Sequence, residues 1–193
     1  QSDDGLQIHQ PIGASARAEV AGSDVDVDVE SELPGAGRIS VSIRALPAAR
    51  FDLAIRAPAW AGNLAMTVDG RTEPARVGED GYLRLNRVWR DSTVELAFDV
   101  RTRLTAAHPA VRENRGRMVV EHGPFVHCLQ GTDNTGVNVH EARLATADPE
   151  RAGEVAGAPT LALATSHGRR AVSIPYFAWA NEGPTDMAVW IAS

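Results

Sequence analysis

The chain has 193 residues and a mass of 20.6 kDa, enough for one large domain or two small ones. Its formal net charge of −6 disfavours nucleic-acid binding, because phosphate backbones recruit basic surfaces. A single cysteine, Cys128, excludes an intrachain disulfide and a cysteine-rich zinc site. No apolar run approaches the roughly 20 residues of a membrane span. We therefore expect a globular protein with no nucleic-acid and no membrane partner.

Period-two alternation of apolar and polar residues predicts strands throughout the first hundred residues. Val25, Val27 and Val29 alternate with acidic residues, and the segments 38–44 and 50–56 repeat the pattern with Arg, Ser and Asp. Each segment has one apolar and one polar face, as expected for a half-buried antiparallel strand. Turn residues at 34–37, Pro47 and Pro58 separate these strands, and further strands are expected at 64–68, 81–86 and 93–100.

The second half of the chain shows a looser pattern of short apolar segments. A Gly-, Ala- and Pro-rich stretch, 147–159, predicts a surface loop. Strands are expected at 117–121, 124–130, 138–145, 160–165, 171–177 and 186–192. The fold class is therefore all-β, with one or two antiparallel β-sandwich domains of jelly-roll or Ig-like type. Because the clean alternation stops between residues 101 and 115, we place the domains at 1–103 and 104–193.

A row of carboxylates, Asp24, Asp26, Asp28 and Glu30, is the first candidate site. An EF-hand loop would need Gly and Glu where the sequence has Val29 and Gly35, so that pattern fails. A hairpin centred on Gly35 instead places Glu32 opposite Arg38 and Asp26 opposite Arg44. Such cross-strand pairs contribute about 0.2–1 kcal/mol each. We expect a solvated, charge-matched sheet face, with a cation site as the alternative.

His122 and His127 flank a Gly-Pro turn, and Cys128 follows. Two histidines and a cysteine are possible zinc ligands, but neighbouring residues on a strand point to opposite faces. The apolar surroundings of Cys128 also suit a buried thiol better than a nucleophile, which needs a base and an electropositive setting. We expect a structural role for all three side chains, with metal binding or catalysis at Cys128 as alternatives.

Glycosidases commonly use a pair of carboxylates as acid and base or nucleophile. The chain has many acidic residues, and nothing in the sequence singles out two of them. We interpret four candidates as surface charges: Glu113, Glu121, Glu141 and Glu182. We find no Gly-rich phosphate loop, no G-x-S-x-G elbow and no H-E-x-x-H motif.

Four tryptophans, Trp60, Trp89, Trp179 and Trp190, are candidate platforms for sugar rings or, alternatively, packed side chains. Trp190 falls in the last predicted strand, which is apolar on both faces and so favours packing. Trp60 and Trp179 each follow a strand, and Asn181 lies beside Trp179. Trp60, Trp179 and Asn181 are therefore the candidate carbohydrate-binding residues.

Several segments resemble, in order, the region that follows the catalytic barrel of glycoside hydrolase family 127, the β-L-arabinofuranosidase-like family once called DUF1680. Residues 5–10 (GLQIHQ) resemble the strand after that barrel. The segment LAIRAPAWA resembles L-x-[IL]-R-[IV]-P-x-W, VDG resembles V-N-G, and GYLRLNRVW resembles G-Y-x-x-[IL]-x-R-x-W. VVEHGPFVHCL resembles v-A-L-x-R-G-P-[LV]-V-Y-x-x-E, and PYFAWANEG with MAVW resembles P-Y-Y-A-W-A-N-R-G…M-x-V-W.

This resemblance implies two β-sandwich domains that follow an N-terminal (α/α)₆ barrel. In the family the barrel carries the chemistry, with a cysteine nucleophile in a zinc site of three cysteines and a glutamate, and an acid/base glutamate nearby. None of these elements is expected here, so we assign no catalytic residue, no metal ligand and no cofactor to this chain. Glu182 replaces the Arg of N-R-G, and the family's Y-P-W-D-G turn has lost its aromatic residues.

Two functions from different classes follow. The chain is either the non-catalytic β-sandwich portion of a glycoside hydrolase, bracing a catalytic barrel upstream of Gln1 and rimming its substrate cleft, or an independent carbohydrate- or protein-binding module. An independently catalytic sandwich is a third alternative. The first residue is Gln1 rather than Met, so we expect a piece of a longer protein. The compartment, bacterial cytoplasm or secreted, is left open by the sequence.

Overall fold

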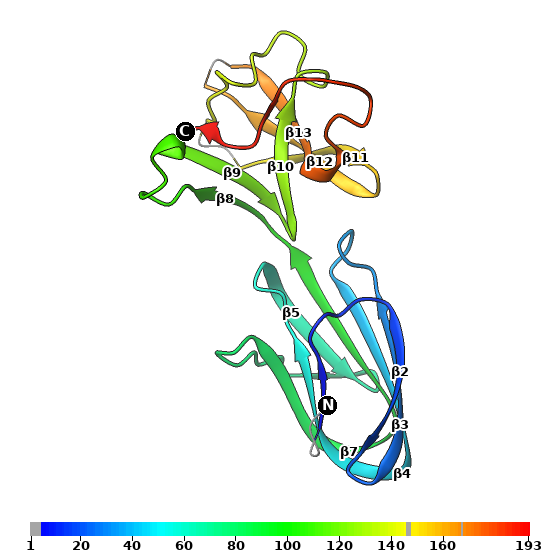
Figure 1. Cartoon of the computed structure of the whole chain (residues 1–193). Helices are drawn as coiled ribbons and strands as arrows, with labels where there is room; N and C mark the ends of the chain where they lie inside the picture. Colours follow the sequence, from blue (N-terminus) through cyan, green and yellow to red (C-terminus); the bar gives the residue numbers. More distant parts are fainter. Residues whose placement is uncertain (1–4, 146–147, 167) are drawn as a thin grey trace. The chain divides into compact units, whose positions relative to one another are not determined.

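The computed structural model of the chain describes residues 5–145, 148–166 and 168–193 (Figure 1). The chain divides into two compact units, with the division between Val100 and Arg101. We refer to the residues up to Val100 as unit 1 and to those from Arg101 as unit 2. Among the described residues, no helix has the length and apolar character needed to cross a membrane.

Unit 1 is one seven-stranded sheet whose main order is β2-β3-β4-β7-β5-β6. All these neighbours pair antiparallel, whereas β1 pairs in parallel with the second half of β4. The strands are β1 (Gly5–Ile8), β2 (Ala14–Val20), β3 (Ser23–Ser31), β4 (Arg38–Arg56), β5 (Ala61–Val68), β6 (Arg71–Glu73) and β7 (Tyr82–Val100).

Two long strands, β4 and β7, lie at the centre of this sheet and allow it to curl over on itself. They pair over most of their length, with a register shift between Arg44 and Ala49. The first half of β4 pairs with β3 and its second half with β1, so the two halves serve different parts of the sheet. Figure 1 shows the sheet curling around this bend, since a bulge increases the local bend and twist of a strand.

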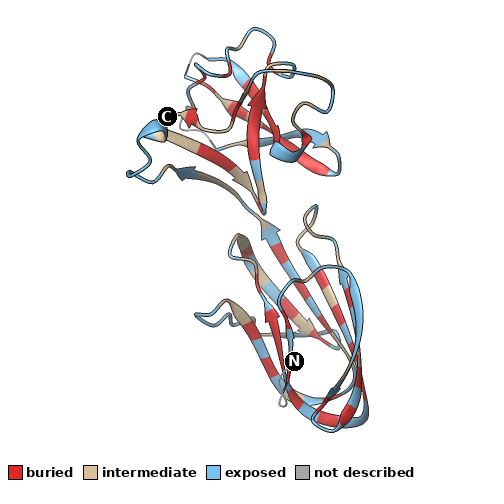
Figure 2. Cartoon of the chain, viewed as in Figure 1, coloured by how far each residue is buried: buried red, intermediate tan, exposed pale blue. Residues whose placement is uncertain are grey.

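The core of unit 1 lies inside this curled sheet. Buried and exposed residues alternate along its strands, as Figure 2 shows in red and blue. The largest fully buried side chains include Phe51, Leu53, Trp89 and Leu96. Full burial of such a side chain contributes about 1.5–3 kcal/mol, so the alternating pattern supplies the main driving force for the fold.

Unit 2 is an eight-stranded sheet with the main order β11-β12-β13-β10-β9-β15; β8 pairs with β9, and β14 with β10. Buried residues form one cluster around Val120, Leu129 and Leu161, and a second around Cys128, Ile174 and Ala178. The elements are β8 (Thr102–Ala106), η1 (Arg112–Asn114), β9 (Arg117–His122), β10 (Phe125–Gln130), β11 (Glu150–Val155), β12 (Ala158–Ala164), β13 (Arg170–Pro175), η2 (Tyr176–Ala178), β14 (Met187–Ala188) and β15 (Ile191–Ala192).

The all-β, antiparallel fold class is confirmed, and most predicted strands are present. The strand expected at 138–145 is wrong: the Asn138 side chain accepts a hydrogen bond from the His140 backbone, and the segment turns. Such an Asx turn competes with a strand ladder. The strands expected at 38–44 and 50–56, with a turn at Pro47 between them, are one strand, β4. Those expected at 81–86 and 93–100 are also one strand, β7.

Two further expectations in unit 2 are corrected. The loop expected at 147–159 contains strand β11, whose residues are almost all exposed and therefore lack an apolar pattern. Ala147 itself lies outside the described residues. The expected last strand, 186–192, is two short strands, β14 and β15, and Trp190 lies in the bend between them.

Candidate binding surfaces

The predicted acidic row lies on the outer face of β3. Val25, Val27 and Val29 are buried in the core of unit 1, so the intervening carboxylates of Asp24, Asp26, Asp28 and Glu30 face outward. The predicted register is confirmed, since Asp26 lies opposite Arg44. The Glu32 backbone N–H donates to the Arg38 carbonyl, as the hairpin around Gly35 requires.

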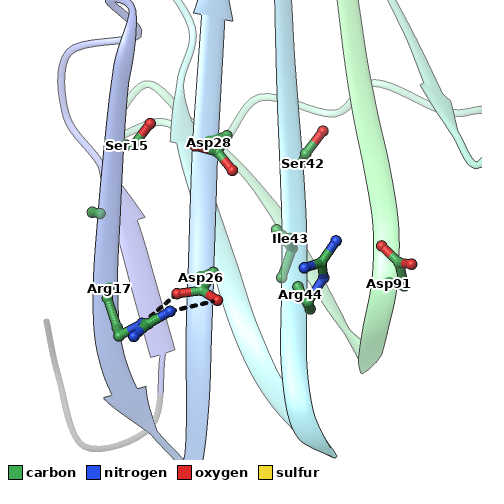
Figure 3. A pocket seen from close by; sticks show the side chains of 9 residues that line it. Ser15, Arg17, Asp26, Asp28, Ser42, Ile43, Arg44 and Asp91 are labelled. Atoms are coloured by element: carbon green, nitrogen blue, oxygen red, sulfur yellow. Dashed lines mark hydrogen bonds and ion pairs between the residues drawn. The ribbon is translucent and has the colours of Figure 1, made fainter.

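Asp26 belongs to a row of alternating charges across four strands, Arg17–Asp26–Arg44–Asp91 (Figure 3). Its ion-pair partner is Arg17, which donates to both carboxylate oxygens at 2.5 and 3.1 Å, rather than the expected Arg44. The Arg17 hydrogen bond holds the pKa of Asp26 below its usual value. A shallow hollow of about 410 Å³ runs along this row and along the polar residues Ser15, Asp28 and Ser42.

Of the four carboxylates in the acidic row, this charge alternation places arginines beside Asp26 alone. Asp24 lies opposite Glu19, and Asp28 lies between Ser15 and Ser42. Cross-strand pairs of opposite charge stabilise a sheet, whereas like charges side by side repel. In the part of the chain that the structure describes, no group of three or more His, Cys, Asp or Glu side chains is arranged to hold a metal ion.

Trp60 lies in the turn immediately before β5, half-buried against the core of unit 1. Its ring contacts Phe98 edge-to-face, with 5.8 Å between the ring centroids. Trp89 is fully buried and donates its Nε1–H to the Phe51 carbonyl at 3.0 Å. Both rings are thus engaged in packing, and a sugar contact at Trp60 stays a prediction.

Trp179 follows η2 in unit 2 and is also half-buried. Its ring lies nearly parallel to that of Tyr176, at 19° and 6.3 Å between centroids, and its Nε1–H donates to the Thr185 carbonyl at 3.4 Å. Tyr176 is 48% exposed, so it offers more ring surface to solvent than the tryptophan that contacts it. The sequence singled out Trp179 and missed Tyr176.

Asn181 lines a hollow of about 350 Å³ in unit 2, which we call the β10–β13 hollow. The hollow combines acidic, amide and hydroxyl groups with an apolar floor. Its lining residues are Gln130, Asp133, Glu154, Val155, Thr160, Val172, Ile174, Ala178, Asn181 and Glu182. They come from four strands, the short helix η2 and two loops. Trp60 belongs to unit 1 and is not among them.

A network of buried amides fixes the inner wall of this hollow. Gln130 is 6% exposed, and its side-chain amide donates to Asp133 and accepts from the Ala180 backbone N–H. Asn134 donates to the carbonyls of Gln130 and Val172 and accepts from the Val172 N–H. A buried network with its partners satisfied is rigid. The wall is therefore preformed.

The two histidines and Cys128 do not form a common site. His127 is fully buried, its Nε2 has no hydrogen-bond partner, and burial lowers its pKa to about 4. Its ring lies 6.4 Å from that of His122, which is hydrogen-bonded to Thr102. Cys128 packs with Ile174 in the second cluster of unit 2, and burial raises its pKa to about 11. A neutral, buried thiol suits neither nucleophilic catalysis nor metal binding.

The four candidate carboxylates have separate environments. Glu121 accepts a hydrogen bond from Thr105 at 2.5 Å and lies 3.4 Å from the Arg103 guanidinium. Glu113 and Glu141 are exposed. Glu182 is also exposed and lines the β10–β13 hollow. Because Glu121 already has a hydrogen bond and an ion pair within unit 2, its carboxylate is engaged in the sheet.

The fold defines the class of protein as a two-unit, all-β one. The family model for the GH127 β-L-arabinofuranosidase middle domain matches residues 5–100, and that for the glycoside hydrolase family 127 C-terminal domain matches residues 102–192. The chain therefore belongs to glycoside hydrolase family 127 and is a non-barrel part of such proteins, so the family predicted from the sequence motifs is confirmed.

Individual relatives agree with this assignment. A non-reducing end β-L-arabinofuranosidase of Bifidobacterium longum subsp. longum is 31% identical over 121 residues, 59% of this chain and 18% of that protein. The crystal structure of a GH127 β-L-arabinofuranosidase from Geobacillus stearothermophilus T6 matches with a TM-score of 0.84 and 26% identity, over 100% of this chain and 34% of that chain. A GH127 β-arabinofuranosidase structure matches with a TM-score of 0.81 and 27% identity, over 98% and 35%. The chain thus spans about a third of these solved relatives, and less of the curated one.

Proposed function

We propose that this chain is the structural portion of a β-L-arabinofuranosidase-like glycoside hydrolase. It packs against a catalytic (α/α)₆ barrel, braces it, and supplies no reacting group. The observation that carries this proposal is the part of the family's proteins that this chain matches. The two non-barrel domain models together match nearly the whole of this chain. The chain covers only 34–35% of two solved relatives, so about two thirds of each relative has no counterpart here.

The side chains of this chain support a non-catalytic role. The zinc site that the family resemblance implies needs three cysteines and a glutamate, whereas this chain has one cysteine. That cysteine, Cys128, is buried with a raised pKa, so the residues present do not fit the zinc. We therefore assign the metal and the nucleophile to the barrel.

Exposed aromatic residues at η2 offer a surface for the barrel. Tyr176 and Phe177 are 48% and 51% exposed, and Phe177 contacts Phe125 with 5.3 Å between ring centroids. Contiguous exposed apolar patches are typical of interaction surfaces. We place part of the barrel contact on Tyr176 and Phe177.

The test is reconstitution with the polypeptide encoded immediately upstream of this chain, produced separately. The pure chain should not hydrolyse an aryl β-L-arabinofuranoside, whereas the barrel should bind the chain in size-exclusion chromatography and melt at a higher temperature in its presence. Turnover by the pure chain that is abolished in Cys128→Ala would overturn the proposal. So would a barrel that neither binds the chain nor melts at a higher temperature in its presence.

A matched pair of variants locates the contact. Phe177→Ser should weaken binding to the barrel, because it removes an exposed aromatic side chain. Val88→Ser, at an equally exposed apolar position on β7 of unit 1, is the control. An equal loss in both variants would argue against the η2 surface, though not against bracing itself.

A further inference from the structure

We propose that the β10–β13 hollow of unit 2 binds a single neutral sugar unit, held by Thr160, Asn181 and the surrounding carboxylates. This site adjoins the proposed barrel contact through Ala178 of η2, but its test requires no barrel. Its volume of about 350 Å³ falls within the range of small-molecule sites, roughly 300–1,000 Å³.

One hydroxyl on a largely buried side chain opens onto the hollow and is free to bind a ligand. Thr160 is 9% exposed and lines the hollow, and its hydroxyl has no hydrogen-bond partner among the described residues. The opposite residue on β11 is Gly153, and a Cβ there would lie 3.3 Å from the Thr160 Oγ1. The glycine therefore leaves the hydroxyl uncrowded and open to the hollow, where a ligand can hydrogen-bond to it.

The carboxylates of the hollow select hydrogen-bond donors. Asp133, Glu154 and Glu182 line it, and no Arg, Lys or His is among the lining residues. Glu154 pairs with Arg151 at 3.1 Å, and Asp133 accepts from the Gln130 amide, so Glu182 and the remaining acceptor sites are left for a ligand. The three groups are not arranged to share a metal ion. They therefore suit separate donors on one ligand.

Amide and hydroxyl groups favour a sugar over a cation. Asn181 is exposed at the hollow, and its side chain, like that of Thr160, can both donate and accept hydrogen bonds. A guanidinium or ammonium group only donates and would leave the Asn181 N–H groups and the Thr160 O–H unused. Sugar hydroxyls do both, and the apolar floor of Val155, Ile174 and Ala178 matches the C–H face of a sugar ring.

The experiment is calorimetric titration of the pure 193-residue chain with L-arabinose, D-galactose, D-glucose and L-arginine. We expect saturable binding of at least one sugar. Asn181→Ala and the isosteric Thr160→Val should each weaken it about three- to tenfold, the effect of losing one hydrogen bond. Thr72→Val, on β6 of unit 1, is the matched control and should bind as the parent does.

Three results would overturn the proposal: no saturable sugar binding, sugar binding unchanged in both variants, or binding of L-arginine alone, which would make the hollow a cation site. Asn181 is exposed, so its variant should retain the parent melting temperature and keep the test decisive even if Thr160→Val is unstable. Because no barrel is used, failure here leaves the bracing role untouched, and failure of reconstitution leaves the sugar site untouched.

Discussion

Arg17 on β2 and Asp26 on β3 form a two-point ion pair on the outer face of unit 1, with the guanidinium donating to both carboxylate oxygens. The pair begins the alternating row that continues through Arg44 to Asp91. It explains how Asp26 is accommodated on a strand that carries four acidic residues. Each carboxylate of Asp26 and Asp91 lies beside an arginine rather than beside another acid.

Replacing Arg17 with Ala should return the pKa of Asp26 toward its ordinary 3.8, because the hydrogen bond that lowers it is lost. A lowered folded-state pKa adds stability above the unfolded pKa and loses it as pH falls through the folded value. The melting-temperature difference between parent and variant should therefore shrink below about pH 4. Carboxyl NMR titration measures the pKa directly. A shift of equal size in Arg44→Ala, which has no hydrogen bond to Asp26, would contradict this account.

His127 should make unit 2 sensitive to acid. Burial lowers its pKa from 6.5 to about 4, with a smaller contribution from His122. The unfolded chain therefore binds the proton first, so the stability is complete above pH 6.5 and falls as pH drops toward 4, by about 3 kcal/mol in total. Urea unfolding between pH 7 and pH 4 measures this loss.

The control for this pH dependence is His127→Gln, which cannot titrate but can still hydrogen-bond to Ser173. It should flatten the slope between pH 6.5 and 4. His140→Gln, at an exposed position, should leave the slope as it is in the parent. The same slope in His127→Gln as in the parent would assign the acid sensitivity to other groups.

The thiol of Cys128 should be unreactive in the folded protein. Burial, and to a lesser extent Asp133, raises its pKa to about 11, so almost no thiolate exists at neutral pH. A colorimetric disulfide reagent should therefore modify the thiol only after denaturation, in a 1:1 ratio. Rapid reaction of the native protein would show instead an accessible, reactive cysteine.

Trp89 should be the tryptophan on which unit 1 depends most. Trp89→Phe removes the hydrogen bond to the Phe51 carbonyl and leaves that acceptor buried, at an expected cost of about 1–3 kcal/mol. Trp60→Phe, at a half-buried position where the ring has no polar partner among the described residues, should cost less than about 1 kcal/mol. Denaturant unfolding followed by circular dichroism compares the two, and the reverse order would refute this ranking.

The sheet of unit 1 could be predicted because its signals are local. Val25, Val27 and Val29 set the period of β3, and the Gly35 turn sets its register against Arg44. Even there, the partner of Asp26 was missed, because Arg17 lies on β2, whose sequence ASARAEV carries no large apolar residue before Val20. Its seven residues are mostly exposed, which removes the periodic pattern on which sequence reasoning depends.

The β10–β13 hollow could be predicted only through Asn181. Its other walls, including Gln130, Glu154 and Thr160, come together by long-range strand pairing, which a single sequence does not reveal. The contact of Trp179 with Tyr176 was equally hidden from the sequence, and a sugar contact at Trp179 stays a prediction. Family motifs supplied what periodicity did not, since they identified both matched regions along the chain.

The most direct test of the central claim is the intact mass of the native protein isolated from its source. If the chain is the structural portion of a barrel-containing glycosidase, the mass should be about three times 20.6 kDa, in line with solved relatives of which it covers 34–35%. A native mass of 20.6 kDa would contradict that claim and leave a free-standing β protein whose function is binding.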